Sequence, residues 1–158
     1  MSILKFRLLL ATPLLILPLT TNLKISNASQ VTPPVTNCFL RVDNPHLSDS
    51  IKRKKGFDAV KVNLISICDK ELLNLKITVV IYKKGLLRNH KVASKTLQIN
   101  GFIPANKRIA HKGTWERCKN ERVSRYYGTA YAVALIQGKE MRTLPVTTQK
   151  TISLPCGT

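Results

Sequence analysis

The spacing of the first two cysteines around a turn-like segment constrains the fold of this chain more than any other feature. The midpoint between Cys38 and Cys68 lies within the cationic run 52–56, which ends in a glycine. Residues placed symmetrically about a turn lie opposite each other in an antiparallel hairpin. The same register places Val42 opposite Leu64, so the apolar faces of the two strands coincide. The spacing therefore predicts a β-hairpin closed by the disulfide Cys38–Cys68.

The other two cysteines repeat this arrangement. Cys118 and Cys156 are centred on residue 137, next to a glycine, which predicts a second hairpin and the disulfide Cys118–Cys156. Each disulfide should stabilise the folded domain by roughly 3 to 4 kcal/mol, because it reduces the conformational entropy of the unfolded chain. The alternative pairing, Cys68–Cys118, would resemble an immunoglobulin domain, in which one disulfide links two sheets. A tyrosine precedes the second cysteine by two residues in such domains, whereas this chain has Glu116 there.

The N-terminal segment has the order of regions found in a signal peptide. Two cations within the first seven residues precede an apolar run over 8–19, and small residues flank position 27. We expect cleavage after Ala28, giving a signal peptide at 1–28, a proline-containing linker at 29–36 and one domain at 37–158. An apolar run of about 12 residues is shorter than the roughly 20 that a spanning helix needs. The alternative is an uncleaved segment that anchors the domain to the membrane.

The composition indicates an exported, strongly basic protein. The 158 residues carry a net charge of +18, and removal of 1–28, with three cations, leaves +15. An even number of cysteines after a signal peptide favours disulfides over metal ligation. The three histidines, His46, His90 and His111, are scattered along the chain, so we expect no metal site and no cofactor. The charge predicts attraction to polyanions; the alternative is a general solubility charge, with the run 52–55 as a solvated hairpin tip.

Alternating apolar residues indicate an all-β domain. Apolar residues recur with period two over 60–64 and 73–81, while 125–136 and 144–156 have the composition of further strands. The segment 101–113, with proline, asparagine and glycine, is expected to be a loop. No helical period stands out after the linker. We therefore predict an immunoglobulin-like antiparallel β-sandwich of about seven strands with two disulfides, preceded by a signal peptide.

The segment 43–46, with the sequence Asp-Asn-Pro-His, is a candidate ligand site because it brings a carboxylate, Asp43, near an imidazole, His46. The alternative is a turn after the first strand, because Asn-Pro favours turn initiation and Asp and Asn side chains bond nearby backbone groups.

A second candidate is an aromatic surface beside arginines. Trp115, Tyr126 and Tyr127 stand close to several arginines and could stack on sugars or bases. The alternative is that the tyrosines pack within a strand, where Tyr127 and Tyr131 share a face.

We do not expect an enzyme. The chain lacks the Gly-x-Ser-x-Gly pattern of a serine nucleophile, and its four cysteines serve better as disulfides than as nucleophiles. Eight acidic residues leave few candidates for a catalytic carboxylate pair, and Glu116 and Glu121 are expected to be solvated.

The chain resembles a group of small secreted actinobacterial proteins of uncharacterised function. The resemblance implies an exported, disulfide-bonded β domain and no particular activity, and this chain is much richer in lysine. The matching positions are Cys38, segment 43–46, Ser48, Cys68, segment 81–85, Cys118, segment 127–130 and Cys156.

These features together predict a secreted or cell-envelope-associated basic domain with a non-catalytic binding or structural role. Its expected partner is an anionic cell-wall polymer or an acidic glycan, with no specific nucleic acid and no membrane span after cleavage. The alternative is a secreted basic effector or toxin that acts on host or competitor cells.

Overall fold

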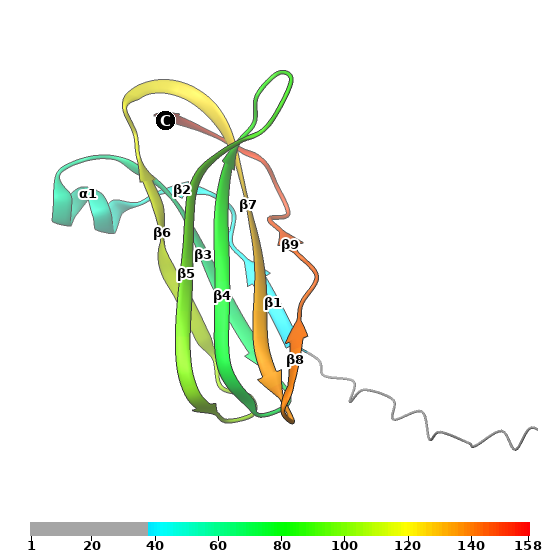
Figure 1. The fold of residues 1–158 in the computed structure, drawn as a ribbon. Coiled ribbons are helices and arrows are strands. Elements are labelled where there is room, and N and C mark those ends of the chain that lie inside the picture. The colour runs from blue at the N-terminus through cyan, green and yellow to red at the C-terminus, as the bar shows by residue number, and fades with distance from the viewer. Residues whose placement is uncertain (1–37) are drawn as a thin grey trace, which may run out of the picture. The chain divides into compact units, whose positions relative to one another are not determined.

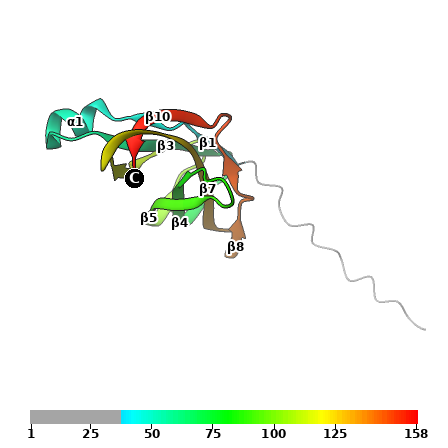
Figure 2. The ribbon, with the colours of Figure 1, turned by 90° about the horizontal axis from the view of Figure 1, so that it is seen from above.

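A computed structural model describes residues 38–158 as two antiparallel sheets packed against each other in a sandwich (Figures 1 and 2). This confirms the predicted all-β fold. The predicted signal peptide at 1–28 and linker at 29–36 lie outside the described residues. Within 38–158, no helix is long and apolar enough to cross a membrane.

The first sheet is built around β3 (Ala59–Cys68), whose residues alternate between the core and the outer surface. β1 (Cys38–Val42) and β2 (His46–Leu47) pair with successive halves of one edge of β3, and β6 (Ile109–Arg117) pairs with the other edge.

The second sheet has β4 and β7 at its centre and β5 at one edge, while β8, β9 and β10 follow one another along the free edge of β7. The bounds of these strands are β4 Leu72–Lys83, β5 His90–Ile103, β7 Asn120–Ile136, β8 Lys139–Arg142, β9 Val146–Thr147 and β10 Ile152–Gly157.

Within residues 38–158, the sandwich has seven strands if each interrupted edge is counted as one strand. β1 and β2 together form the first strand, and β8, β9 and β10 together form the last. In constant-type immunoglobulin domains the fourth strand joins the sheet of the first and second. Here the fourth strand, β5, pairs with the third, β4, in the opposite sheet. If the seven strands are numbered in chain order, one sheet has the order 1-2-5 and the other has the order 4-3-6-7.

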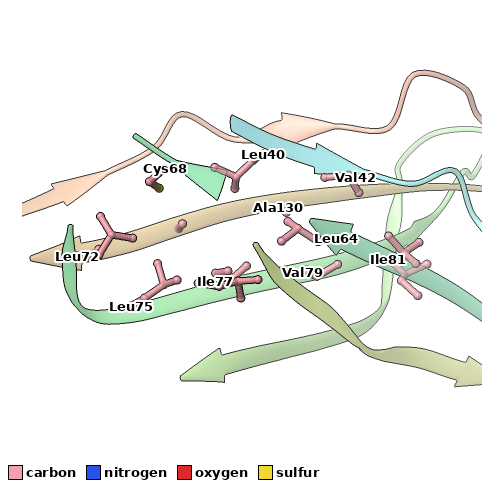
Figure 3. Packing of buried hydrophobic residues seen from close by; sticks show 14 of the residues in the cluster. Leu40, Val42, Leu64, Cys68, Leu72, Leu75, Ile77, Val79, Ile81 and Ala130 are labelled. Carbon is pink, nitrogen blue, oxygen red and sulfur yellow. The ribbon is translucent and has the colours of Figure 1, made fainter. Parts of the chain in front are cut away.

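The core lies between the sheets (Figure 3). β4 contributes alternate residues from Leu75 to Ile81, all close to fully buried, and β3 faces them with residues such as Leu64. β7 contributes mainly alanines, together with the larger buried side chains of Tyr126 and Ile136. Burial of apolar area at about 25 cal/mol per Å² makes this interface the main stabilising feature of the domain.

Both predicted disulfides are present. Cys38 pairs with Cys68 across β1 and β3 in the predicted register, which also places Val42 opposite Leu64. Cys118 pairs with Cys156 and ties the β6–β7 connection to β10. The first bond lies within one sheet, unlike the intersheet bond of an immunoglobulin domain. Two disulfides indicate an oxidising environment such as the extracellular space.

The run 52–55 forms part of a short helix, α1 (Asp49–Lys55), rather than the predicted hairpin tip. Asp49 lies in its first turn and four cations fill its last turns, which suits the helix dipole. Gly56, with φ of 75°, ends the helix in the left-handed conformation and donates its N–H to the carbonyl of Lys52, 2.8 Å away.

Two expectations about strands are wrong. The predicted loop at 101–113 contains the end of β5 and the start of β6. The segment 144–156 is not one continuous strand, because an irregular connection separates β9 from β10 and a bulge follows Pro155. As a result, Ile152 pairs with Tyr126, which shifts the register away from the simple hairpin centred on 137.

Candidate ligand-binding surface

The segment 43–46 forms the turn between β1 and β2, and its polar groups contact local partners. Asp43 lies 3.6 Å from the guanidinium of Arg41, and the Nδ1 atom of His46 lies 3.2 Å from the carbonyl oxygen of Asn44. The amide oxygen of Asn44 accepts a hydrogen bond from the backbone N–H of Lys150. These contacts favour the turn interpretation. Within 38–158, no group of three His, Cys, Asp or Glu side chains is arranged to hold a metal ion.

Tyr126 does not belong to a surface, which corrects the prediction for this residue. Its side chain is fully buried, because the even-numbered residues of β7 face the core. Its hydroxyl donates a 2.5 Å hydrogen bond to the carbonyl oxygen of Cys156 and lies 3.2 Å from the hydroxyl of Thr158. Tyr126 therefore holds the C-terminal strand to β7.

Tyr127, the next residue, faces outward from the second sheet. Its ring stacks on that of Tyr82, with 5.2 Å between ring centroids. Further along the same face, Arg142 lies over the ring of Tyr131. Trp115 belongs to the first sheet, so the predicted aromatic residues occupy different layers and do not form one platform.

Trp115 lies at the centre of a basic aromatic cluster on the outer side of the first sheet. The ammonium of Lys55 is 4.7 Å from the centroid of its indole, and the ring of Phe57 packs beside it at 6.0 Å. The guanidinium of Arg117 lies 4.7 Å from the centroid of Phe57. Lys61 is opposite Trp115 on the neighbouring strand. These five residues, Lys55, Phe57, Lys61, Trp115 and Arg117, are called the basic aromatic cluster below.

The local sequence explains how the cluster forms. β3 turns Val60 and Val62 into the core, so the intervening Lys61 must face outward. His46 and Trp115 pair with Lys61 from either side, and directly opposed residues of antiparallel strands share a face. Two predicted site residues, His46 and Trp115, therefore lie on one surface with Lys61 between them.

The electrostatics of the cluster favour an anionic ligand. Partial burial lowers the pKa of Lys61 below its ordinary value of 10.5, and the positive charges of Lys112 and Lys54 lower it further. Asp58, the acidic residue next to Phe57, is already paired with Lys52 at 3.2 Å. A bound anion would relieve the repulsion among these lysines.

Sequence reasoning missed three members of the cluster, Lys55, Phe57 and Lys61. The alternation in β3 could have indicated that Lys61 faces outward, because this lysine stands between two apolar residues, Val60 and Val62. The position of Lys55 depends on α1, and the sequence pattern did not predict that helix.

An apolar cavity of about 330 Å³ opens between the sheets beside β1 and β8. Leu40 and Leu75 line it together with the small side chains of Ala132 and Ala134, which leave the space unfilled. Arg142 is the one ionisable side chain among its lining residues. The cavity therefore offers volume but little polar chemistry.

Comparisons of the chain with models of protein families, with curated proteins and with solved structures found no match. The resemblance to small secreted actinobacterial proteins therefore stays a prediction from the residues quoted above.

Proposed function

We propose that this protein is a secreted, non-catalytic β domain that binds anionic polymers of the cell envelope. The observation that carries the proposal is the basic aromatic cluster, in which Lys55 lies over Trp115 and Arg117 lies over Phe57. The net charge of +15 that remains after removal of 1–28 adds long-range attraction to any polyanion.

The mixture of aromatic rings and cations suits a charged polymer with sugar units. An indole face can stack on the apolar face of a sugar ring, while lysine and arginine pair with carboxylate or phosphate groups. Trp115 is only partly buried, so its ring lies at the surface beside Lys61. An acidic glycan or a phosphate-containing wall polymer is therefore the expected ligand class.

A non-catalytic role is proposed because the described residues offer few groups for catalysis. All four cysteines are in disulfides. Asp43 and His46, the pair considered from the sequence, contact other partners.

The test is co-sedimentation of the oxidised protein with isolated envelopes and with a soluble acidic glycan across a salt series. The triple variant Lys55→Gln, Lys61→Gln, Arg117→Gln should weaken binding by about tenfold or more, since each lost charge pair is worth up to roughly 1 kcal/mol near a surface. The matched control is Lys70→Gln, Lys76→Gln, Lys139→Gln, which removes the same charge from exposed positions elsewhere.

Equal losses in the two triple variants would mean that the attraction is general and that the cluster is not a site. A Trp115→Ala variant adds a second criterion, because it removes the stacking surface without changing the charge. Retention of full glycan affinity in this variant would contradict stacking on Trp115. The alternative function, a secreted effector or toxin that acts on membranes, predicts leakage from liposomes at low salt.

A further inference from the structure

The loop between β4 and β5 exposes two adjacent leucines at its tip. Leu86 and Leu87 have exposed fractions of 106% and 100%, the highest of the large apolar side chains in the described part of the chain. Figure 1 shows this loop projecting beyond the strands that it connects. Exposed apolar side chains are common singly, but an adjacent pair at a projecting tip suits an interaction surface.

The loop has a defined shape that holds the leucines outward. A methyl group on Gly85 would overlap the carbonyl oxygen of Arg88, so the backbone closes tightly on itself at this glycine. At the base, the backbone N–H of Lys84 donates to the carbonyl oxygen of Arg125, 2.7 Å away. This hydrogen bond anchors the base of the loop to β7, while Leu86 and Leu87 extend into solvent.

Cations flank the two leucines in the chain. Lys84 precedes them, and Arg88 and Lys91 follow. The ammonium of Lys83 donates a hydrogen bond to the carbonyl oxygen of Thr158, 3.0 Å away. The whole stretch 72–115 contains nine lysines and arginines and no aspartate or glutamate. An anionic surface can therefore approach the tip without meeting a carboxylate of this stretch.

We propose that this leucine tip, residues 83–91, docks on the surface of an anionic lipid bilayer. Leu86 and Leu87 enter the boundary between headgroups and acyl chains, and Lys84, Arg88 and Lys91 lie against lipid phosphates. Binding at a membrane surface combines buried apolar area with attraction of basic residues to anionic lipid. The site is separate from the basic aromatic cluster, which belongs to the other sheet and to α1.

The convex form of the tip favours a bilayer over a soluble polymer. A polyanion in water offers charge but no apolar phase, so it leaves Leu86 and Leu87 exposed. A bilayer can bury the two leucines and pair with the neighbouring cations at the same time, because the apolar pair and the cations are adjacent in the chain. A protein with an apolar groove is the competing occupant, and the test distinguishes it.

The experiment measures co-sedimentation of the oxidised protein with sucrose-loaded vesicles of phosphatidylcholine, with and without phosphatidylglycerol. We expect binding to the anionic vesicles that weakens as salt rises. The variant Leu86→Ser, Leu87→Ser should lower the partition by about tenfold or more, because it removes two apolar side chains from the buried area. The control Phe102→Ser, Leu144→Ser removes two other exposed apolar side chains and should partition like the unchanged protein.

Failure of the unchanged protein to bind anionic vesicles, or equal partition of the leucine variant, would overturn the proposal. If the leucine variant loses only a protease-sensitive binding to whole cells, the occupant is a protein and not a bilayer. The acidic-glycan assay on the same variant separates the two proposals, since the basic aromatic cluster is intact and glycan binding should be unchanged. Thermal unfolding of each variant verifies that the fold is retained.

Discussion

Gly128 is the position where one added methyl group should reveal how tightly the two sheets pack. It lies in β7 with its backbone buried against the first sheet. A Cβ atom at this position would lie 2.8 Å from Cγ1 of Val62 and 3.2 Å from Cγ2 of Thr148. Val62 is fully buried and its β-branched side chain has little rotamer freedom, so it cannot move aside easily.

Two opposing effects determine the result of Gly128→Ala. Replacing glycine by alanine within a strand favours folding by roughly 0.5 to 1 kcal/mol, because the unfolded chain loses conformational freedom. Overpacking a well-filled core costs about 1 to 3 kcal/mol. The cost of overpacking exceeds the gain from the reduced freedom of the unfolded chain. We therefore expect a net destabilisation of about 0.5 to 2 kcal/mol, seen as a lower midpoint of urea unfolding.

A second substitution tests the cause. Val62→Ala removes the methyl groups that the new alanine side chain would meet, and by itself costs roughly 2 to 3 kcal/mol through lost burial and a cavity. In that background the added methyl fills space, so Gly128→Ala should become neutral or stabilising. A destabilisation of the same size in both backgrounds would refute the proposed contact with Val62, as would a Gly128→Ala protein as stable as the unchanged one.

Two further substitutions address buried polar groups. Tyr126→Phe should destabilise the domain by about 1 to 3 kcal/mol, because the carbonyl of Cys156 loses its hydrogen bond inside the protein, whereas Tyr127→Phe on the outer face should have little effect in the same thermal unfolding assay. His111 is buried, and its pKa is lowered from the ordinary value of 6.5 mainly by that burial, so the unfolded state binds its proton at higher pH than the folded state. The stability that neutral His111 contributes is therefore complete above pH of about 6.5 and declines as the pH falls below it. Urea midpoints between pH 7.5 and 5 should show this decline, and a His111→Gln protein with an equally steep decline would contradict the assignment.

The sequence predicted the first hairpin well because two independent features agreed. The cysteine spacing and the alternation around Val42 and Leu64 both specified one register, and a shift by one residue would have moved the apolar face to solvent. The second hairpin lacked that agreement, because the alanines of β7 mark its buried face only weakly. The correct disulfide was predicted there, although the strand register was wrong.

Long-range contacts explain a local error in β4. Leu73 was expected on the buried side with Leu75, yet it is 42% exposed. Between them, Asn74 adopts a positive φ of 54°, and its side-chain oxygen accepts a hydrogen bond from the N–H of Gly101. That partner lies 27 residues away in β5, so the irregularity could not be foreseen from the alternation of β4.

The candidate site was only partly predictable from the sequence. Tyr126 and Tyr127 were both placed on a ligand surface, but consecutive strand residues face opposite sides, so one of them had to be buried. Trp115 lies on the outer face of the first sheet beside cations, and its role in binding stays a prediction. The cation that lies over its ring, Lys55, comes from a helix of seven residues that has too few turns for a recognisable period.

The two disulfides join cysteines that follow each other in the chain, the first with the second and the third with the fourth. In a chain whose N-terminal end emerges first from a ribosome or an export channel, Cys68 therefore meets Cys38 before Cys118 or Cys156 is available to compete. The same holds for Cys118 and Cys156 once the first pair is closed. Oxidation during emergence from a narrow exit thus yields the native bonds directly, without the reshuffling that interleaved pairings require.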